Sequence, residues 1–190
     1  MVKKAAMGVA LVVLAEVLAQ PPKGKVLPPI SLPTLDGKQF TLKVVYDKKR
    51  KAKVLSVTLR HRSKGKWVTK TIPAKAVLLD FWASWCGPCM AAIPHLVSLH
   101  KRYSKKGLLV VGVNLGERRS TVSRVVRSMG VPYIVVLDQR LKTPKPYKIK
   151  GIPMMVVVDS RGIVRHTQVG FSRRLERELE EVIKSLLGIR

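Results

Sequence analysis

The chain has 190 residues, 46% of them hydrophobic, and its 37 Lys and Arg against 11 Asp and Glu give a formal net charge of +26. This length suits one domain with a complete core, and the apolar fraction excludes an intrinsically disordered chain. The charge favours anionic surroundings such as phospholipid headgroups, nucleic acid or acidic proteins, without selecting among them.

The N-terminus has the pattern of a secretory signal peptide. Lys3 and Lys4 precede an apolar run from Ala5 to Ala15, which is short for a membrane span because a spanning helix needs about 20 residues. The small residue Ala19 predicts a cleaved signal peptide over residues 1–19, and an uncleaved membrane anchor is the alternative. Either form would place the protein in the periplasm or cell envelope, which is an oxidising environment.

A linker and a small β-hairpin are expected next. Residues 20–29 are rich in Pro, Gly and Lys and are interpreted as the linker. In residues 30–42, Leu35-Asp36-Gly37-Lys38 is a hairpin-turn signal between short apolar or β-branched segments. The hairpin is predicted to open a single domain over residues 30–190.

The composition changes between residues 43 and 76, which contain 12 Lys or Arg and one acid, Asp47. Strands are predicted at residues 54–59 and 67–72, with a turn at residues 63–66 between them. Apolar and polar residues alternate in the first strand, so one face can be buried while the basic side chains stay in water. We interpret this segment as a basic β-hairpin insertion.

The rest of the chain alternates strands and helices. Continuous apolar strands with helices between them imply an α/β fold with a central sheet covered on both faces. Strands are predicted at residues 77–83, 108–114 and 133–138 and on both sides of a turn at 159–162, and helices at 88–103, 120–129 and 172–187.

The two cysteines, Cys86 and Cys89, lie three residues apart at a predicted strand-to-helix junction. In a first helical turn this spacing brings their α-carbons within the roughly 4.4–6.8 Å that a disulfide needs, and Pro88 suits that turn. The positive helix end would stabilise a Cys86 thiolate and lower its pKa from about 8.5. Cys86 is therefore the expected attacking thiol and Cys89 the buried resolving thiol, with a static disulfide as the alternative.

Two cysteines cannot form a four-cysteine zinc site. We therefore expect no metal and no cofactor beyond a redox-active Cys86–Cys89 disulfide.

The segment Val77-Leu78-Leu79-Asp80-Phe81-Trp82-Ala83-Ser84-Trp85-Cys86-Gly87-Pro88-Cys89 resembles the active-site segment of thioredoxin. Gly151-Ile152-Pro153, followed by a Val-rich strand, resembles the cis-proline loop of that superfamily, and Pro94 matches its helix-kinking proline. The resemblance implies a thioredoxin fold, a central mixed β-sheet flanked by helices.

Within the superfamily the chain is most similar to the exported TlpA/ResA-like thiol-disulfide oxidoreductases. Leu35-Asp36-Gly37-Lys38 matches their N-terminal hairpin, and residues 111–117 match their extra strand-loop segment. The insertion at residues 43–76 departs from the pattern, because family members usually have a much shorter link there. Met154 stands where threonine is common and is expected to make the substrate groove more apolar.

Two acids are candidate catalytic residues. Asp80 lies inside an apolar strand, where burial raises a carboxyl pKa, and the resemblance gives it the role of exchanging a proton with Cys89. A salt-bridged strand acid is the alternative. Glu117 matches an acid that approaches the active site in ResA-like proteins, or it is a solvated loop acid beside Arg118.

The resemblance also implies the substrate-binding residues. Trp85 is expected as an exposed aromatic contact, and Gly87, Pro88 and Ile152 as its neighbours in the site. Pro153 is expected in the cis form, facing the disulfide and letting the substrate backbone pair beside it.

These features predict dithiol-disulfide exchange that reduces the disulfides of exported proteins. The family resemblance suggests apocytochrome c or copper-site cysteines as substrates and a membrane thiol-electron carrier as the donor. The Gly-Pro dipeptide between the cysteines is that of thioredoxin, which favours reduction over oxidation.

Two other functions remain as alternatives. A thiol peroxidase would need a Pro-x-x-x-Thr-x-x-Cys signature, but Leu79 and Ala83 occupy those positions before Cys86. A docking or scaffold protein would use the basic insertion to bind an anionic membrane surface. Nucleic acid is the weaker partner, because Trp67 and Tyr46 supply few surfaces for base stacking.

Overall fold

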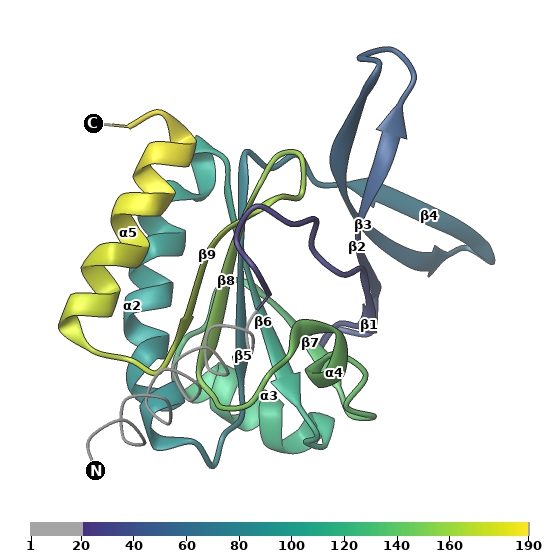
Figure 1. The fold of residues 1–190 in the computed structure, drawn as a ribbon. Helices are drawn as coiled ribbons and strands as arrows, with labels where there is room; N and C mark the ends of the chain where they lie inside the picture. The colour runs from purple at the N-terminus through teal and green to yellow at the C-terminus, as the bar shows by residue number, and fades with distance from the viewer. Residues whose placement is uncertain (1–20, 190) are drawn as a thin grey trace, which may run out of the picture.

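The computed structural model describes residues 21–189 (Figure 1), so the predicted signal peptide at residues 1–19 lies outside the described residues. Within the described part, no helix is both long and apolar enough to cross a membrane. The segment predicted as a linker lies against the turn before β9. There Leu27 is buried and its N–H donates to the Gly162 carbonyl at 2.9 Å, while Val26 bridges to Ile163.

A five-stranded mixed sheet forms the centre of the molecule, in the order β7-β6-β5-β8-β9. Its members are β5 (Ala76–Trp82), β6 (Leu108–Leu115), β7 (Ile134–Asp138), β8 (Met154–Asp159) and β9 (Val164–Val169). The first three run parallel, β8 is antiparallel to β5, and β9 is antiparallel to β8. The carboxyl ends of β5, β6 and β7 therefore meet at one edge of the sheet.

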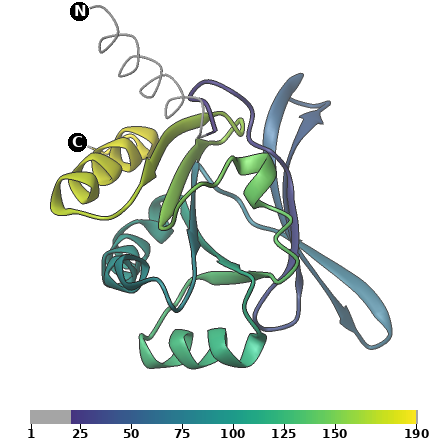
Figure 2. The same ribbon diagram turned by 60° about the horizontal axis from the view of Figure 1, so that its bottom comes forward.

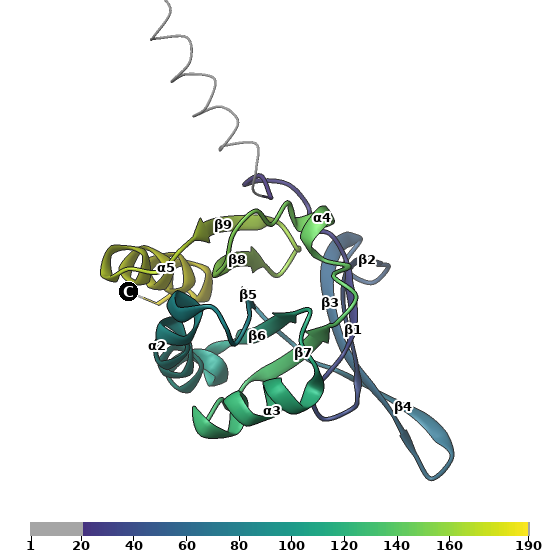
Figure 3. The same cartoon turned by 90° about the horizontal axis from the view of Figure 1, so that it is seen from below.

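Three helices cover one face of this sheet (Figures 2 and 3). They are α2 (Gly87–Tyr103), α3 (Arg119–Ser128) and α5 (Arg173–Leu187). The predicted strands and helices of the α/β part are all present, with bounds that differ by one residue at most. The one-turn helices η1 (Ser104–Lys106) and α4 (Pro144–Tyr147) were not predicted, because elements this short carry no periodicity.

A second, antiparallel sheet covers the opposite face, in the order β1-β2-β3-β4. Its strands are β1 (Ile30–Pro33), β2 (Gln39–Asp47), β3 (Ala52–Ser63) and β4 (Lys66–Thr71). The predicted hairpin joins β1 to β2. The basic insertion forms two hairpins, β2–β3 and β3–β4, and is continuous with the first one. The predicted insertion hairpin is present as β3–β4, and the β2–β3 hairpin is an additional one that was not predicted.

Few residues of the insertion are fully buried in the core. Val57 of β3 is buried beside Phe40 and Leu42 of β2, whereas all six residues of β4 are exposed. The tips of both hairpins project from the body of the molecule (Figure 1). The insertion is thus anchored at its base and presents its basic ends to the surroundings.

Candidate active site

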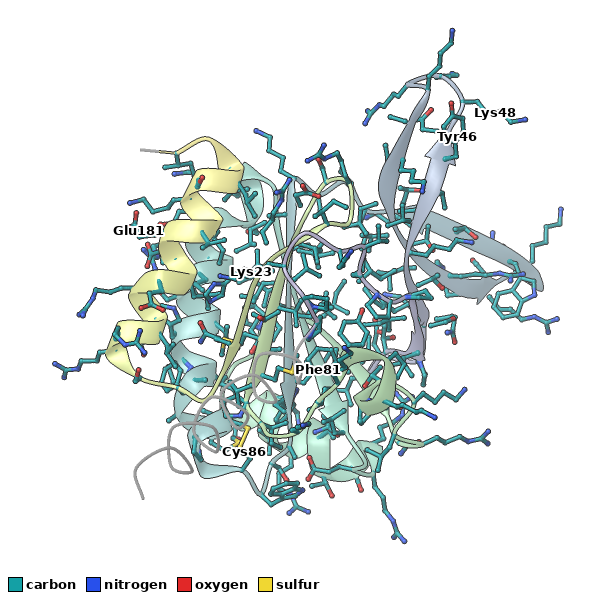
Figure 4. All side chains as sticks on the ribbon, in the orientation of Figure 1. Lys23, Tyr46, Lys48, Phe81, Cys86 and Glu181 are labelled. Carbon is teal, nitrogen blue, oxygen red and sulfur yellow. A yellow bond between two sulfur atoms is a disulfide. The ribbon has the colours of Figure 1, made fainter. Side chains whose placement is uncertain are left out.

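The Cys86–Cys89 disulfide lies where β5 ends and α2 begins, near the bottom of Figure 4. Its α-carbons are 5.2 Å apart. Cys86 is the N-cap of α2, and its Sγ accepts a hydrogen bond from the Cys89 N–H at 3.2 Å. Pro88 lies in the first turn, as predicted. The Cys86 sulfur therefore lies at the positive end of α2, where a thiolate is stabilised.

The two sulfurs differ in access. Cys86 is 6% exposed and Cys89 is 0% exposed. The Cys86 Sγ also lies 3.7 Å from the carbonyl oxygen of Ile152, which is 66 positions away in the sequence. The Ile152–Pro153 peptide bond is cis. The predicted proline loop thus faces the more accessible sulfur.

Asp80 is a buried carboxyl group on the helix-covered face of β5. It is 1% exposed, its Oδ1 has no hydrogen-bond partner, and burial raises its pKa to about 7. Side chains alternate along a strand, so Asp80 shares its face with Leu78 and Trp82, which belong to the same core cluster as Cys89. No Lys or Arg of residues 21–189 forms an ion pair with Asp80. The structure thus disfavours the alternative of a salt-bridged strand acid.

Gly112, the partner of Asp80 on β6, leaves room for two neighbouring rings. A Cβ atom added to Gly112 would lie 3.1 Å from the Trp82 indole nitrogen and 3.5 Å from the Tyr133 ring. The negative charge of Asp80 also contributes to the raised pKa of Tyr133, after burial. Sequence reasoning missed Tyr133, because nothing local to it indicates that it comes close to β5.

Glu117 is bonded to the loop that carries the disulfide and is not a solvated loop acid. Its carboxylate accepts hydrogen bonds from the Ser84 backbone N–H at 2.7 Å, from the Ser84 hydroxyl and from the Asn114 side-chain amide at 2.6 Å. None of the hydrogen bonds found in residues 21–189 joins Glu117 to a sulfur. The structure gives Glu117 the contacts of a positioning residue, and its predicted catalytic role stays a prediction.

Sequence reasoning also missed Ser84 and Asn114 as parts of this arrangement. Asn114 carries a signal that could have found it, because it is a fully buried polar residue at the end of a Val-rich strand.

An exposed collar surrounds the accessible sulfur. Trp85 is 74% exposed, Gly87 and Pro88 are also exposed, and Ile152 is half-buried. Pro153 is itself buried. The predicted substrate-binding residues thus gather around Cys86.

The expectation for Met154 is wrong. Its side chain is fully buried in the core cluster between the two sheets, which also contains Phe81 and Tyr147. Met154 therefore does not line the groove, because the alternation of β8 turns its side chain away from the helix-covered face.

The described residues contain no group of three His, Cys, Asp or Glu side chains placed to hold a metal ion. The chemistry that this arrangement offers is exchange of the disulfide, with the more exposed cysteine at a helix end, a fully buried partner cysteine and a carboxyl group that can hold or release a proton near neutral pH.

Comparison with known protein families matches residues 51–183 to the Redoxin family. The curated relatives include "Thiol-disulfide oxidoreductase ResA" of Halalkalibacterium halodurans, 30% identical over 116 residues, which are 60% of this chain and 66% of that protein. The protein of the same name in Bacillus subtilis is 31% identical over 93 residues, 49% of this chain and 52% of that protein. The matched region spans no more than about two thirds of these relatives.

Solved structures have the same fold. A putative thiol:disulfide interchange protein DsbE from Chlorobium tepidum has a TM-score of 0.66 at 27% identity, covering 87% of this chain and 98% of that chain. A putative protein disulfide isomerase from Bacteroides thetaiotaomicron has a TM-score of 0.67 at 21% identity, covering 87% and 90%. These findings confirm the predicted thioredoxin fold and the predicted similarity to ResA-like proteins.

Proposed function

The chain belongs to the Redoxin family, and on that basis we propose that it is a thiol-disulfide oxidoreductase that reduces disulfides of exported proteins. The observation that carries the proposal is the Cys86 sulfur at the start of α2, in the more exposed of the two cysteines and 3.7 Å from the Ile152 carbonyl of the cis-proline loop. The printed names of the ResA and DsbE relatives support the same chemistry.

The reaction starts from the dithiol form. The Cys86 thiolate attacks one sulfur of the substrate disulfide, whose S–S bond breaks, and a mixed disulfide forms while the other substrate sulfur leaves as a thiolate and takes up a proton. The Cys89 thiolate then attacks the Cys86 sulfur. The second substrate sulfur leaves with the bonding electron pair and is protonated. Two electrons have passed to the substrate, and Cys86–Cys89 is oxidised to the disulfide.

Asp80 supplies the proton acceptor for the second attack. Its unpartnered Oδ1 and a pKa of about 7 allow the carboxylate to take the Cys89 proton and release it again near neutral pH. Glu117 holds Ser84, two residues before Cys86, and so helps to order the loop that carries the attacking sulfur.

The substrate chain lies across the exposed collar. Trp85, Gly87 and Pro88 supply contact surface beside Cys86, and the backbone of Ile152, beside Pro153, offers a place for an extended peptide to pair. Apocytochrome c and copper-site cysteines are the proposed substrates in the periplasm or cell envelope. A membrane thiol-electron carrier is the proposed donor that regenerates the dithiol.

The reduction potential of the Cys86/Cys89 pair tests the direction of the reaction. It is measured on the chain without residues 1–19, equilibrated in a series of dithiothreitol or glutathione buffers. A value near about −270 mV, that of thioredoxin, would support a reductase. A value near about −120 mV, that of DsbA, would overturn that assignment, because the difference of about 150 mV corresponds to roughly 7 kcal/mol for two electrons.

A second function, docking to an anionic membrane surface, is favoured by the exposed β3–β4 hairpin. The Trp67 ring has the Arg60 guanidinium 4.2 Å from its centroid and the Arg62 guanidinium 5.4 Å away. Tryptophan and arginine are typical of membrane interfaces, and each basic residue near an anionic surface contributes about 1 kcal/mol. A ring with guanidinium groups above it is less available for stacking on bases.

Removing charges from the hairpin tests this docking better than deleting the insertion, because Val57 of the insertion is part of the core and its loss would disturb the fold. Lys64→Gln, Lys66→Gln and Lys70→Gln together are expected to weaken binding to phosphatidylglycerol vesicles in a sedimentation assay while disulfide exchange stays unchanged. Unaltered vesicle binding, or stronger binding to single-stranded nucleic acid than to vesicles, would contradict membrane docking.

A further inference from the structure

A groove of about 990 Å³ lies at the edge of the central sheet opposite the disulfide. Its walls come from separate parts of the chain: the β2–β3 turn and β3, the link from β4 to β5, the turn around η1, and the C-terminal end of α5. A pocket of this size can hold a small organic molecule or part of a larger amphiphile.

Backbone hydrogen bonds fix these walls to one another. The Leu55 N–H donates to the Ser160 carbonyl at 2.8 Å, which ties β3 to the β8–β9 turn. The Lys75 N–H donates to the Gly107 carbonyl at 2.9 Å, which ties the β4–β5 link to the turn after η1. The groove is therefore already formed in the structure described here.

The lining combines an apolar floor with a basic rim. Half-buried or buried apolar side chains, such as those of Leu55, Ile72 and Leu187, lie along it. Four basic residues also line it: Arg50, Lys75, Lys105 and Lys106. This chemistry matches an amphiphile that has an acyl chain and an anionic head.

Asp47, the one acid among the described lining residues, is engaged within its own turn. Its carboxylate accepts hydrogen bonds from the N–H groups of Lys49 and Arg50 at 2.9 and 3.1 Å, and an oxygen lies 3.6 Å from the Arg50 side chain. The rim therefore keeps a strong excess of positive charge.

The groove and the disulfide lie at opposite ends of β5. Lys75 immediately precedes that strand and Cys86 follows it, so the seven residues of β5, a length of roughly 23 Å, separate them. The basic tip at Lys48 projects beyond the groove end of the molecule, while Cys86 lies at the far end (Figure 4). A membrane contacting the groove end would leave the disulfide facing away from it.

We propose that this groove binds the headgroup and adjoining acyl chain of an anionic phospholipid, and that the bound lipid orients the disulfide away from the membrane. The inference rests on the proposed membrane docking and adds a specific lipid site and an orientation. It also assigns a role to Lys105 and Lys106, which lie outside the insertion.

The test is a calorimetric titration of the full-length oxidised protein with a short-chain phosphatidylglycerol kept below its micelle-forming concentration. It measures the affinity for the monomeric lipid. The Lys105→Glu/Lys106→Glu variant reverses two charges on the rim. The Arg124→Glu/Arg140→Glu variant reverses two exposed charges outside the groove and changes the net charge equally. We expect the rim variant to lose roughly tenfold or more in affinity and the control variant to change little.

Three outcomes would overturn the lipid site: no binding of the monomeric lipid, equal losses in both variants, or full displacement of the lipid by inorganic phosphate. If the Lys64/Lys66/Lys70 variant loses vesicle binding while the rim variant does not, the docking by the hairpin stands and the groove proposal fails.

The orientation has its own measurement. The reduced protein reacts with hydroxyethyl disulfide, a small neutral substrate, and thermal unfolding shows separately that each variant is folded. We expect the same rate in solution and on phosphatidylglycerol vesicles. A strong loss of rate on vesicles would mean that the membrane covers Cys86 and would overturn the orientation.

Discussion

The Glu117 carboxylate accepts a 2.7 Å hydrogen bond from the backbone N–H of Ser84, which joins the loop after β6 to the loop after β5. The same carboxylate also accepts from the Ser84 hydroxyl and from Asn114. Because Ser84 lies two residues before Cys86, this side chain helps to hold the start of α2 in place. An acid outside the disulfide motif therefore becomes part of the site.

Glu117→Ala is expected to lower kcat/KM for protein disulfides several-fold and to cost about 1–3 kcal/mol of stability, because the Ser84 N–H and the Asn114 amide lose their acceptor. Glu117→Gln keeps one carbonyl oxygen and should recover most of both losses. The pH of half-maximal activity should not move in either variant. A shift in that pH, as shown by a pH–rate profile, would instead indicate that Glu117 exchanges protons during the reaction.

Asp80→Asn is expected to slow resolution of the mixed disulfide by roughly tenfold or more, because the proton acceptor for Cys89 is lost. The wild-type resolution rate should rise with pH through about 7, the pKa of Asp80, and the variant should lack that step. Stopped-flow measurement of mixed-disulfide decay between pH 5 and pH 9 checks both. An unchanged pH step in the variant would assign the titration to another group.

The same substitution should affect stability in a pH-dependent way. Asp80 keeps its proton in the folded state up to about pH 7, whereas the unfolded chain releases it near 3.8. Folding therefore loses free energy as pH rises through this window, by at most about 4 kcal/mol. Asp80→Asn should be more stable than wild type at pH 8 and gain nothing at pH 4, as measured by urea unfolding. A gain that is equal at both pH values would contradict this origin.

Trp85→Ala is expected to leave stability within about 0.5 kcal/mol of wild type, because the side chain is 74% exposed. It should raise KM for disulfide-containing proteins several-fold and leave the rate with hydroxyethyl disulfide unchanged. Only a protein substrate is large enough to contact the Trp85 side chain while its disulfide reacts with Cys86. Equal effects on both substrates would mean that Trp85 acts on Cys86 itself.

Gly162→Ala should cost roughly 3 kcal/mol or more. Gly162 has a φ of +77°, and a Cβ atom there would lie 2.9 Å from a methyl carbon of Leu27 and closer still to Val44. Gly130→Ala is the matched control, because its φ is +59° but the space around it is open. Thermal unfolding distinguishes them, and similar losses in the two variants would mean that backbone strain alone decides the cost.

Much of the fold could be predicted because its signals are local. The apolar run of β5, the proline in the first turn of α2 and the Asp-Gly turn of the first hairpin each identify an element without reference to the rest of the chain. The cysteine spacing and the likeness of residues 77–89 to thioredoxin then indicate the site, and the structure places Cys86 beside Ile152 of the proline loop as expected.

What could not be predicted depends on contacts between distant segments or on weak turn signals. The β2–β3 turn consists of Lys48-Lys49-Arg50-Lys51, with no glycine, asparagine or proline, although Lys51 has a φ of +48°. The β2–β3 hairpin was missed for that reason. The bonds of Glu117 and the buried face taken by Met154 follow from how strands pair, which no short stretch of sequence determines.

The β4 strand pairs with β3 alone in the described part of the chain, so its outer row of backbone N–H and C=O groups is open. An open strand edge invites pairing with another copy of itself and so promotes aggregation. Lys66 and Lys70 make such pairing electrostatically unfavourable, because two copies would bring like charges together. The same basic residues that are proposed to contact a membrane would therefore also keep individual molecules apart in solution.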